Sequence, residues 1–105
     1  MSEFCLIYTT LPNQQAAKTL GEDIIQKRLA ACANIFPSMY SIYEWDSEYA
    51  DEAETMMILK TRRALVPQLK EEVERLHPYD TPAVLVIPIE DGSQGYLDWV
   101  RQQTS

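Results

Sequence analysis

The sequence predicts an α+β domain in which helices cover one face of a four-stranded antiparallel sheet. Three observations favour this class: strand-like apolar runs alternate with two amphipathic helices, the expected order is β-α-β-β-α-β-α, and the second strand is unusually long. Two right-handed crossover connections place both long helices on one face, which gives a ferredoxin-like βαββαβ sandwich with an extra C-terminal helix. We expect residues 1–105 to form a single domain.

The first two elements are a strand and a helix. Phe4 to Tyr8 (FCLIY) is a continuous apolar run, which is typical of a buried strand. Asn13 follows Pro12 and is a good helix N-cap. The apolar residues of the helix that follows recur at i, i+3 and i+4, and they are Ala17, Leu20, Ile24, Ile25 and Leu29.

The long strand extends from Leu29 to Trp45, well beyond the usual length of about 5–6 residues. After a break at Pro37-Ser38 its residues alternate between two sides. One side has Tyr40, Ile42 and Glu44, and the other has Ser41, Tyr43 and Trp45. A strand of this length extends past a small domain, so we expect its aromatic end to pack against something outside the domain.

The next two elements are a strand and a second helix. Asp46 to Glu52 is polar and predicts a turn, and Ala53 to Thr61 predicts the third strand. The second helix begins close to Ala64–Val66, because Pro67 is tolerated only in a first turn. It ends at His77-Pro78.

The fourth strand is Val84 to Ile89 (VLVIPI), and the last helix is Tyr96 to Gln102. The first, third and fourth strands are apolar on both faces, whereas a sheet covered on one face only should alternate. One short helix is too small to cover the second face. We therefore expect self-association, with the long strand as the exchanged element and Tyr40, Ile42 or the residues that share their face of that strand in the interface.

The composition excludes several classes of partner. The net charge of -7 argues against nucleic acid or an anionic membrane as the main partner. No apolar run approaches the roughly 20 residues of a membrane span, and the N-terminal residues lack a signal-peptide pattern. Cys5 and Cys32 have no CxxC spacing, and the predicted strand order separates them. These features predict reduced thiols and a cytoplasmic location.

Two residues are candidates for metal binding. His77 is the only histidine, and at a helix end it is expected on sequence alone to cap the helix; the functional alternative is a metal ligand. Cys32, among alanines, is expected to pack as a small hydrophobe, and its alternative is a soft-metal or redox role.

Other polar and aromatic groups suggest weaker hypotheses. The acidic residues of the hairpin region fit a solvated turn better than a hard-cation site, and they are Glu44, Asp46, Glu48, Asp51, Glu52 and Glu54. Lys60 at a strand end could meet an anion or form an ion pair. No nucleophile, base and oxyanion hole assemble in this sequence, so we do not expect an enzyme.

Five segments in order over nearly the whole chain carry a family resemblance. They are LAACANIFP, Ser41-x-Tyr43-x-Trp45, MMILKT, LHPYDTPAVLVIPI and GYLDWV. Together they resemble the CutA divalent-cation-tolerance family. The resemblance implies a ferredoxin-like fold, a homotrimer similar in fold to the PII signalling proteins, and a role in tolerance of copper and other divalent metal ions.

Some positions depart from what the family implies. Thr9 stands where copper-binding members can have a cysteine, and Leu76 stands where a second histidine can precede the HPY motif. Ala83 replaces the usual glutamate, and Ser47 replaces the hairpin glycine. The predicted metal ligand is therefore His77, with Cys32 able to help only if its thiol faces the same cleft.

Two functions follow from these observations. The first is a trimeric, non-enzymatic protein of divalent-cation tolerance that binds copper or another divalent cation. The alternative is a PII-like signalling or scaffold module that binds a small ligand or a protein partner between subunits. The residues predicted to line that cleft are Tyr43, Trp45, Lys60 and Tyr79.

Overall fold

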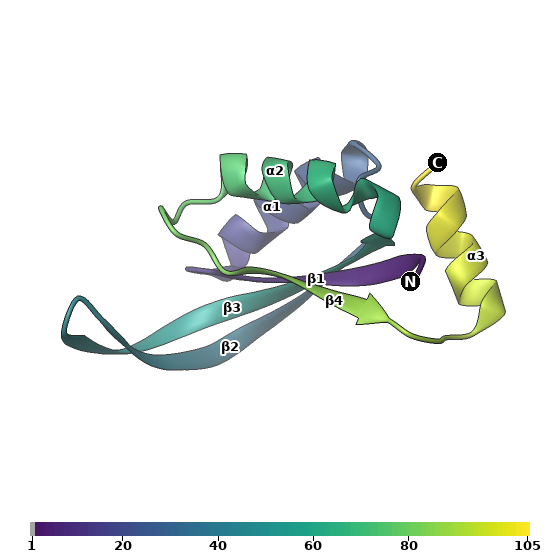
Figure 1. Cartoon of the computed structure of the whole chain (residues 1–105). Helices are drawn as coiled ribbons and strands as arrows, with labels where there is room; N and C mark the ends of the chain where they lie inside the picture. The colour runs from purple at the N-terminus through teal and green to yellow at the C-terminus, as the bar shows by residue number, and fades with distance from the viewer. Residues whose placement is uncertain (1) are drawn as a thin grey trace.

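The computed structural model describes residues 2–105, which form a four-stranded sheet and three α-helices (Figure 1). The elements, in chain order, are β1 Phe4–Leu11, α1 Gln14–Gln26, β2 Cys32–Trp45, β3 Glu48–Arg62, a 3-10 turn Arg63–Leu65, α2 Val66–Leu76, β4 Val84–Ile89 and α3 Gln94–Gln103. The predicted α+β class and the predicted element order are confirmed.

The sheet has the order β2-β3-β1-β4, and every neighbouring pair is antiparallel. Figure 1 shows α1 and α2 side by side on one face of this sheet, and α3 at the end where β1 begins. Because β3 lies between β1 and β2, the prediction that Cys5 and Cys32 do not pair is confirmed, and both are free thiols. No helix in residues 2–105 combines the length and apolar character that crossing a membrane requires.

The helix starts follow from local chemistry. Asn13 is the N-cap of α1, and its side-chain oxygen accepts a hydrogen bond of 2.8 Å from the backbone N–H of Ala16. Pro67 lies in the first turn of α2, where its missing N–H leaves no helical hydrogen bond unmade. Both helix starts agree with the sequence prediction.

The core lies between the sheet and the two helices. Alternate residues of β1 and β3 point toward the helices and are fully buried, for example Ile7 and Leu59. They pack with buried residues of α1 and α2, chiefly Leu20, Ile24, Leu69 and Val73. Burying one such side chain contributes about 1.5–3 kcal/mol to folding, so this layer holds the two helices on the sheet.

The opposite face, called the open face below, is also apolar but remains exposed. Strand alternation and the pairing register place Leu6, Tyr8, Phe36, Ile58, Leu85 and Ile87 on it. Phe36, Leu85 and Ile87 expose 46%, 56% and 43% of their surface. The prediction that these strands are apolar on both faces is therefore confirmed.

The predicted turn from Asp46 to Glu52 is wrong. The turn is Asp46-Ser47 alone, and β3 begins at Glu48, so β2 and β3 form a long arm that extends beyond the helices (Figure 1). Both turn residues have positive φ, 51° and 66°, as a tight two-residue hairpin requires. The sequence from Glu48 onward is polar and therefore typical of a loop, because much of the arm is exposed to solvent on both faces.

Other boundaries also differ from the prediction, and α3 spans Gln94–Gln103 where Tyr96 to Gln102 was predicted. β1 continues through Thr9 to Leu11, because these residues still pair with β3. β2 begins at Cys32 and not at Leu29, because the chain turns at Arg28, whose φ is 57°. The pairing between β2 and β3 is irregular between Phe36 and Met39, and the predicted break at Pro37-Ser38 is this irregularity.

Candidate functional site

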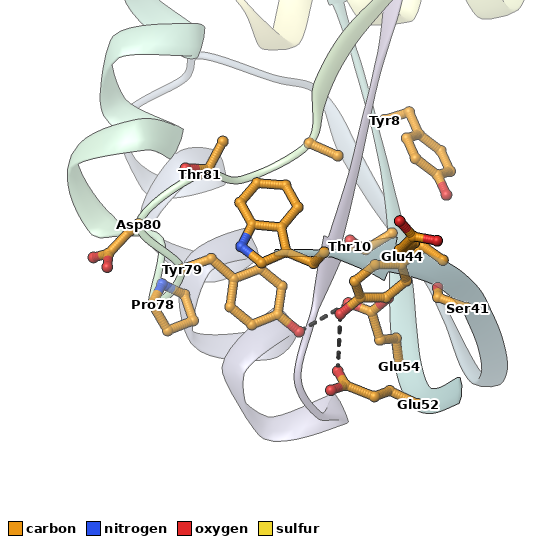
Figure 2. A pocket seen from close by; sticks show the side chains of 13 residues that line it. Tyr8, Thr10, Ser41, Glu44, Glu52, Glu54, Pro78, Tyr79, Asp80 and Thr81 are labelled. Atoms are coloured by element: carbon orange, nitrogen blue, oxygen red, sulfur yellow. Dashed lines mark hydrogen bonds between the residues drawn. The ribbon is translucent and has the colours of Figure 1, made fainter. Parts of the chain in front are cut away.

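An open groove lies between the β2–β3 arm and the loop that leads from α2 to β4. Its volume is about 870 Å³. Figure 2 shows the side chains that line it. They are Tyr8, Thr10, Ser41, Tyr43, Glu44, Trp45, Glu52, Glu54, Pro78, Tyr79, Asp80, Thr81 and Ala83.

The arm contributes one face of the groove through strand alternation. Ser41, Tyr43 and Trp45 are spaced by two along β2, so they project from the same side of the strand. Ser41 pairs with Glu52 of β3 in the ladder, and Met39 pairs with Glu54, so both glutamates project from that same side. The groove is therefore the open face of the arm, continued at its inner end by Tyr8 and Thr10 of β1.

Two tyrosine–glutamate hydrogen bonds organise this wall (Figure 2). The Tyr79 hydroxyl donates to Glu54 Oε2 at 2.8 Å, and the Tyr43 hydroxyl donates to Glu52 Oε2 at 3.3 Å. Burial, and then the neighbouring carboxylate of Glu54, raises the pKa of Tyr79 above its usual value. Burial, followed by the charge of Glu52, raises the pKa of Tyr43. Both phenols therefore stay protonated and act as donors at neutral pH.

His77 lies behind the groove as the C-cap of α2, in a buried position with 8% exposure. Its Nδ1 accepts a hydrogen bond of 3.1 Å from the backbone N–H of Tyr79, and its Nε2 donates to the carbonyl oxygen of Thr10 at 2.8 Å. These partners fix the neutral tautomer with the proton on Nε2. Burial lowers the pKa of His77, which also favours the neutral ring. The predicted position of His77 at the helix end is confirmed. Its ring nitrogens, however, bond to the backbone of Thr10 and Tyr79.

Lys60 is not part of the groove lining. It pairs with Cys32 across β2 and β3, and its Nζ donates to the Tyr96 hydroxyl at 3.1 Å and lies 5.1 Å from the centre of that ring. Six residues of strand, roughly 20 Å, separate it from Glu54. Tyr43, Trp45 and Tyr79 are thus brought together in one groove, and Lys60 is not.

A family model described as "CutA1 divalent ion tolerance protein" matches residues 5–103. The chain belongs to the CutA1 family. The "Divalent-cation tolerance protein CutA" of Thermus thermophilus is 41% identical over 104 residues, which are 99% of each chain. These relatives are named for tolerance and not for a catalysed reaction.

A solved structure and a second sequence relative agree with this assignment. The crystal structure of CutA1 from Ehrlichia chaffeensis superposes with a TM-score of 0.95 at 34% identity, covering 100% of this chain and 98% of that one. The "Protein CutA, chloroplastic" of Arabidopsis thaliana is 42% identical over 94% of this chain, which spans about half (54%) of that protein's length. The predicted family is therefore confirmed.

The two predicted metal ligands of this CutA1 chain do not meet within one chain. Cys32 pairs with Lys60, which lies opposite Leu6 of β1, whereas His77 bonds to Thr10, four residues farther along that strand. In residues 2–105 no three histidine, cysteine, aspartate or glutamate side chains gather in a way that could hold a metal ion. Cys32 is half-buried and Thr9 is buried.

Sequence reasoning missed the two glutamates of the groove. Glu52 was expected in the turn and Glu54 at the start of the third strand, both in a solvated acidic region; both lie on β3, and Glu54 is only 8% exposed. The signal that could have found them is their spacing of two, which continues through Met56 and Ile58 on the open face. That alternation places both carboxylates on the same side as Tyr43.

Proposed function

We propose that this CutA1 family member acts in divalent-cation tolerance as a homotrimer, in the cytoplasm and without catalysing a reaction. The observation that carries the proposal is the exposed apolar open face, together with an arm that extends away from its own domain. Tyr40, Ile42 and Tyr49 of this arm expose 72%, 64% and 75% of their surface. Apolar surface of this extent favours burial against other copies of the chain.

The sheet edges support the same assembly. β2 and β4 are the two edge strands, so each has a row of backbone groups without a strand partner in the described chain. A second copy can pair with these edges while it covers the open face. An obligate interface of this kind typically buries roughly 2,000 Å² or more.

For the metal, we propose that copper or another divalent cation binds through the imidazole of His77. Copper favours nitrogen and sulfur ligands. The free electron pair of Nδ1 accepts the Tyr79 N–H, so a bound cation has to displace that hydrogen bond. Cys32 can serve as a further ligand only from a different subunit, because the sheet separates it from His77 within one chain. We therefore expect weak binding.

Titration of copper into wild type, His77→Ala and Cys32→Ser tests the metal proposal. Wild type should bind at pH 7.5 and lose affinity at pH 5.5, because a protonated ring cannot ligate. His77→Ala should lose the site, and Cys32→Ser should weaken it if the thiol takes part. Equal affinity of wild type and His77→Ala would exclude His77, and no saturable binding in any protein would make the metal effect indirect.

The alternative function is that of a signalling or scaffold module whose groove binds a small ligand. The observation that favours it is that Tyr43, Trp45 and Tyr79 line one groove of about 870 Å³, a size typical of ligand sites. Thermal melting with panels of metal ions and of metabolites distinguishes the two functions, because only a compound that binds the folded state raises Tm.

A further inference from the structure

We infer that Asp91 is a site of spontaneous covalent modification, where its side chain and the Gly92 amide close a succinimide ring that opens to isoaspartate. This modification is independent of the functions proposed above. The two residues lie in the connection from β4 to α3, which Figure 1 shows at the end of the molecule opposite the arm. Neither residue belongs to the open face or to the groove lining.

The dipeptide itself favours ring closure. The chain has three glycines, and only Gly92 follows an aspartate or asparagine. Ring closure brings the amide nitrogen of the next residue onto the side-chain carbon of the aspartate, so a side chain on that next residue obstructs the approach. Glycine has no side chain, and its backbone turns more freely toward the carboxyl group.

The folded loop holds the two reacting groups together. The Gly92 N–H donates to Asp91 Oδ1 at 2.8 Å. Because Oδ1 is bonded to Cγ, the attacking nitrogen is held beside the carbon that it must reach. Residues 90–93 lie outside every helix and strand, so no ladder hydrogen bond fixes this N–H. Asp91 and Gly92 are both exposed, so water reaches the ring once it forms.

The reaction needs no reagent other than water. The Gly92 nitrogen forms a bond to Asp91 Cγ and loses its proton, and one carboxyl oxygen takes up that proton and one from solvent and leaves as water. Hydrolysis of the ring at Cγ restores aspartate. Hydrolysis at the main-chain carbonyl carbon of Asp91 instead leaves the chain linked through Cβ and Cγ, which is isoaspartate. One water is released and one is consumed, so the net change is an isomerisation.

The other aspartates lack this combination of features. Three lie inside regular elements whose backbone is fixed, and they are Asp23, Asp51 and Asp98. Asp80 precedes the β-branched Thr81, which obstructs the approach. Asp46 lies in the exposed hairpin turn, but the residue after it is serine. We therefore expect Asp91 to react about tenfold faster than any of them.

Isoaspartate adds one carbon to the main chain directly ahead of α3. The Ser93 carbonyl accepts the Leu97 N–H at 3.0 Å in the first turn of this helix, and Tyr96 in the same turn accepts a hydrogen bond from Lys60. A longer connection shifts that turn, so the modified chain should hold α3 less firmly on the sheet. Faster amide hydrogen exchange across residues 94–103 in the modified fraction measures this loosening.

The test incubates the protein in its native assembly for several weeks at pH 7 and 37 °C in water enriched in heavy oxygen, followed by peptide mapping with mass spectrometry. The peptide that contains Asp91 should gain heavy oxygen, and an isoaspartyl methyltransferase with labelled S-adenosylmethionine should methylate it. Gly92→Ala should slow both by about fivefold. This variant fits the loop, because the φ of Gly92 is not positive and the added carbon meets Leu97 Cδ1 at an ordinary 3.5 Å. Asp91→Glu should abolish both signals, since its ring would need six members.

Circular dichroism and light scattering show whether the variants retain fold and assembly. If Gly92→Ala does not, Asp91→Asn replaces it; this variant loses ammonia to form the same ring and should gain heavy oxygen faster than wild type. Labelling of Asp91 no faster than that of Asp46 would overturn the inference, as would equal rates in wild type and the folded comparison variant. An unlabelled Asp91 in the folded protein, over a period that labels an unfolded peptide of the same sequence, would show that the loop blocks ring closure and would also overturn it.

Discussion

The two faces of the sheet contain similar side chains but differ in burial. On the helix-covered face Ile7 and Leu59 have no exposed surface, whereas on the open face Leu85 and Ile87 expose 56% and 43% of theirs. Part of the difference comes from position in the sheet, because Leu85 and Ile87 belong to the edge strand β4, where Val86 on the covered face also exposes 36% of its surface. The other part comes from the layer packed above each face. The chain covers one face with its own helices, and under the proposed trimer other copies cover the second.

The largest expected effect comes from the covered face. Leu59→Ala should lower the free energy of unfolding by about 2–5 kcal/mol, because it leaves a cavity in a fully buried site. Chemical denaturation at several protein concentrations measures this loss, which should be present at all of them. A loss below about 1 kcal/mol would mean that this face is not the core.

Leu85→Ala on the open face is the matched comparison, since it removes the same atoms. Its cost should appear at micromolar protein concentration, where the open face is covered by other copies, and should shrink only on dilution far enough below that range to separate the copies. A cost independent of concentration would place Leu85 in the core of the single chain and would remove the distinction between the two faces.

An intermediate effect is expected at His77, which holds the loop that passes from the helix layer to the open face. His77→Leu removes both ring hydrogen bonds, those with Thr10 and Tyr79. Leaving the buried carbonyl group without a donor should cost about 1–3 kcal/mol at pH 7.5. Denaturation curves of the two proteins measure this cost, and equal stability would show that the imidazole does not hold the loop.

The same pair of proteins predicts a pH dependence. Burial lowers the pKa of His77 in the folded protein below the value of about 6.5 that it has in the unfolded chain. Between the two pKa values the unfolded chain therefore binds more protons than the folded protein. The stability from the neutral ring is thus complete above about pH 6.5 and is lost as pH falls toward the folded pKa. Because His77 is the only histidine, the wild-type advantage over His77→Leu should shrink from pH 7.5 to 5.5. A constant advantage would contradict this account.

The smallest effect is expected at the tip of the arm. Ser47 has φ of 66°, a conformation that glycine adopts more readily, so Ser47→Gly should raise the free energy of unfolding by about 0.5 kcal/mol. The control is Ser41→Gly, which lies in β2 outside the left-handed region and should be destabilising by a similar or larger amount. Thermal melting compares the two, and a lower Tm for Ser47→Gly would refute the prediction.

Much of the fold could be predicted from the sequence because local signals agree with it. Asn13 and Pro67 marked helix starts, and apolar runs marked the inner strands. The outer half of the arm could not be predicted, because its polar residues from Glu48 onward pack on no layer of this chain. From the sequence alone such a polar segment is typical of a loop, and only its pairing with β2 shows that it is a strand.

The site was predicted in part for a similar reason. Tyr43, Trp45 and Tyr79 were expected together and line one groove. Lys60 was also expected in the groove. The strand register places it opposite Cys32 instead, and residue type alone does not give that position along the strand. The surroundings of Glu54 needed the three-dimensional structure, since its hydrogen-bond donor, Tyr79, lies on a loop distant in sequence.

The central claim, that the open face is covered by other copies of the chain, is tested most directly by multi-angle light scattering across a dilution series in the micromolar range. The claim predicts a constant mass of three times the 12.1 kDa chain for wild type. Tyr43→Asp places a charge on the open face of the arm and should shift that mass downward. A wild-type mass of one chain throughout the series would contradict the claim.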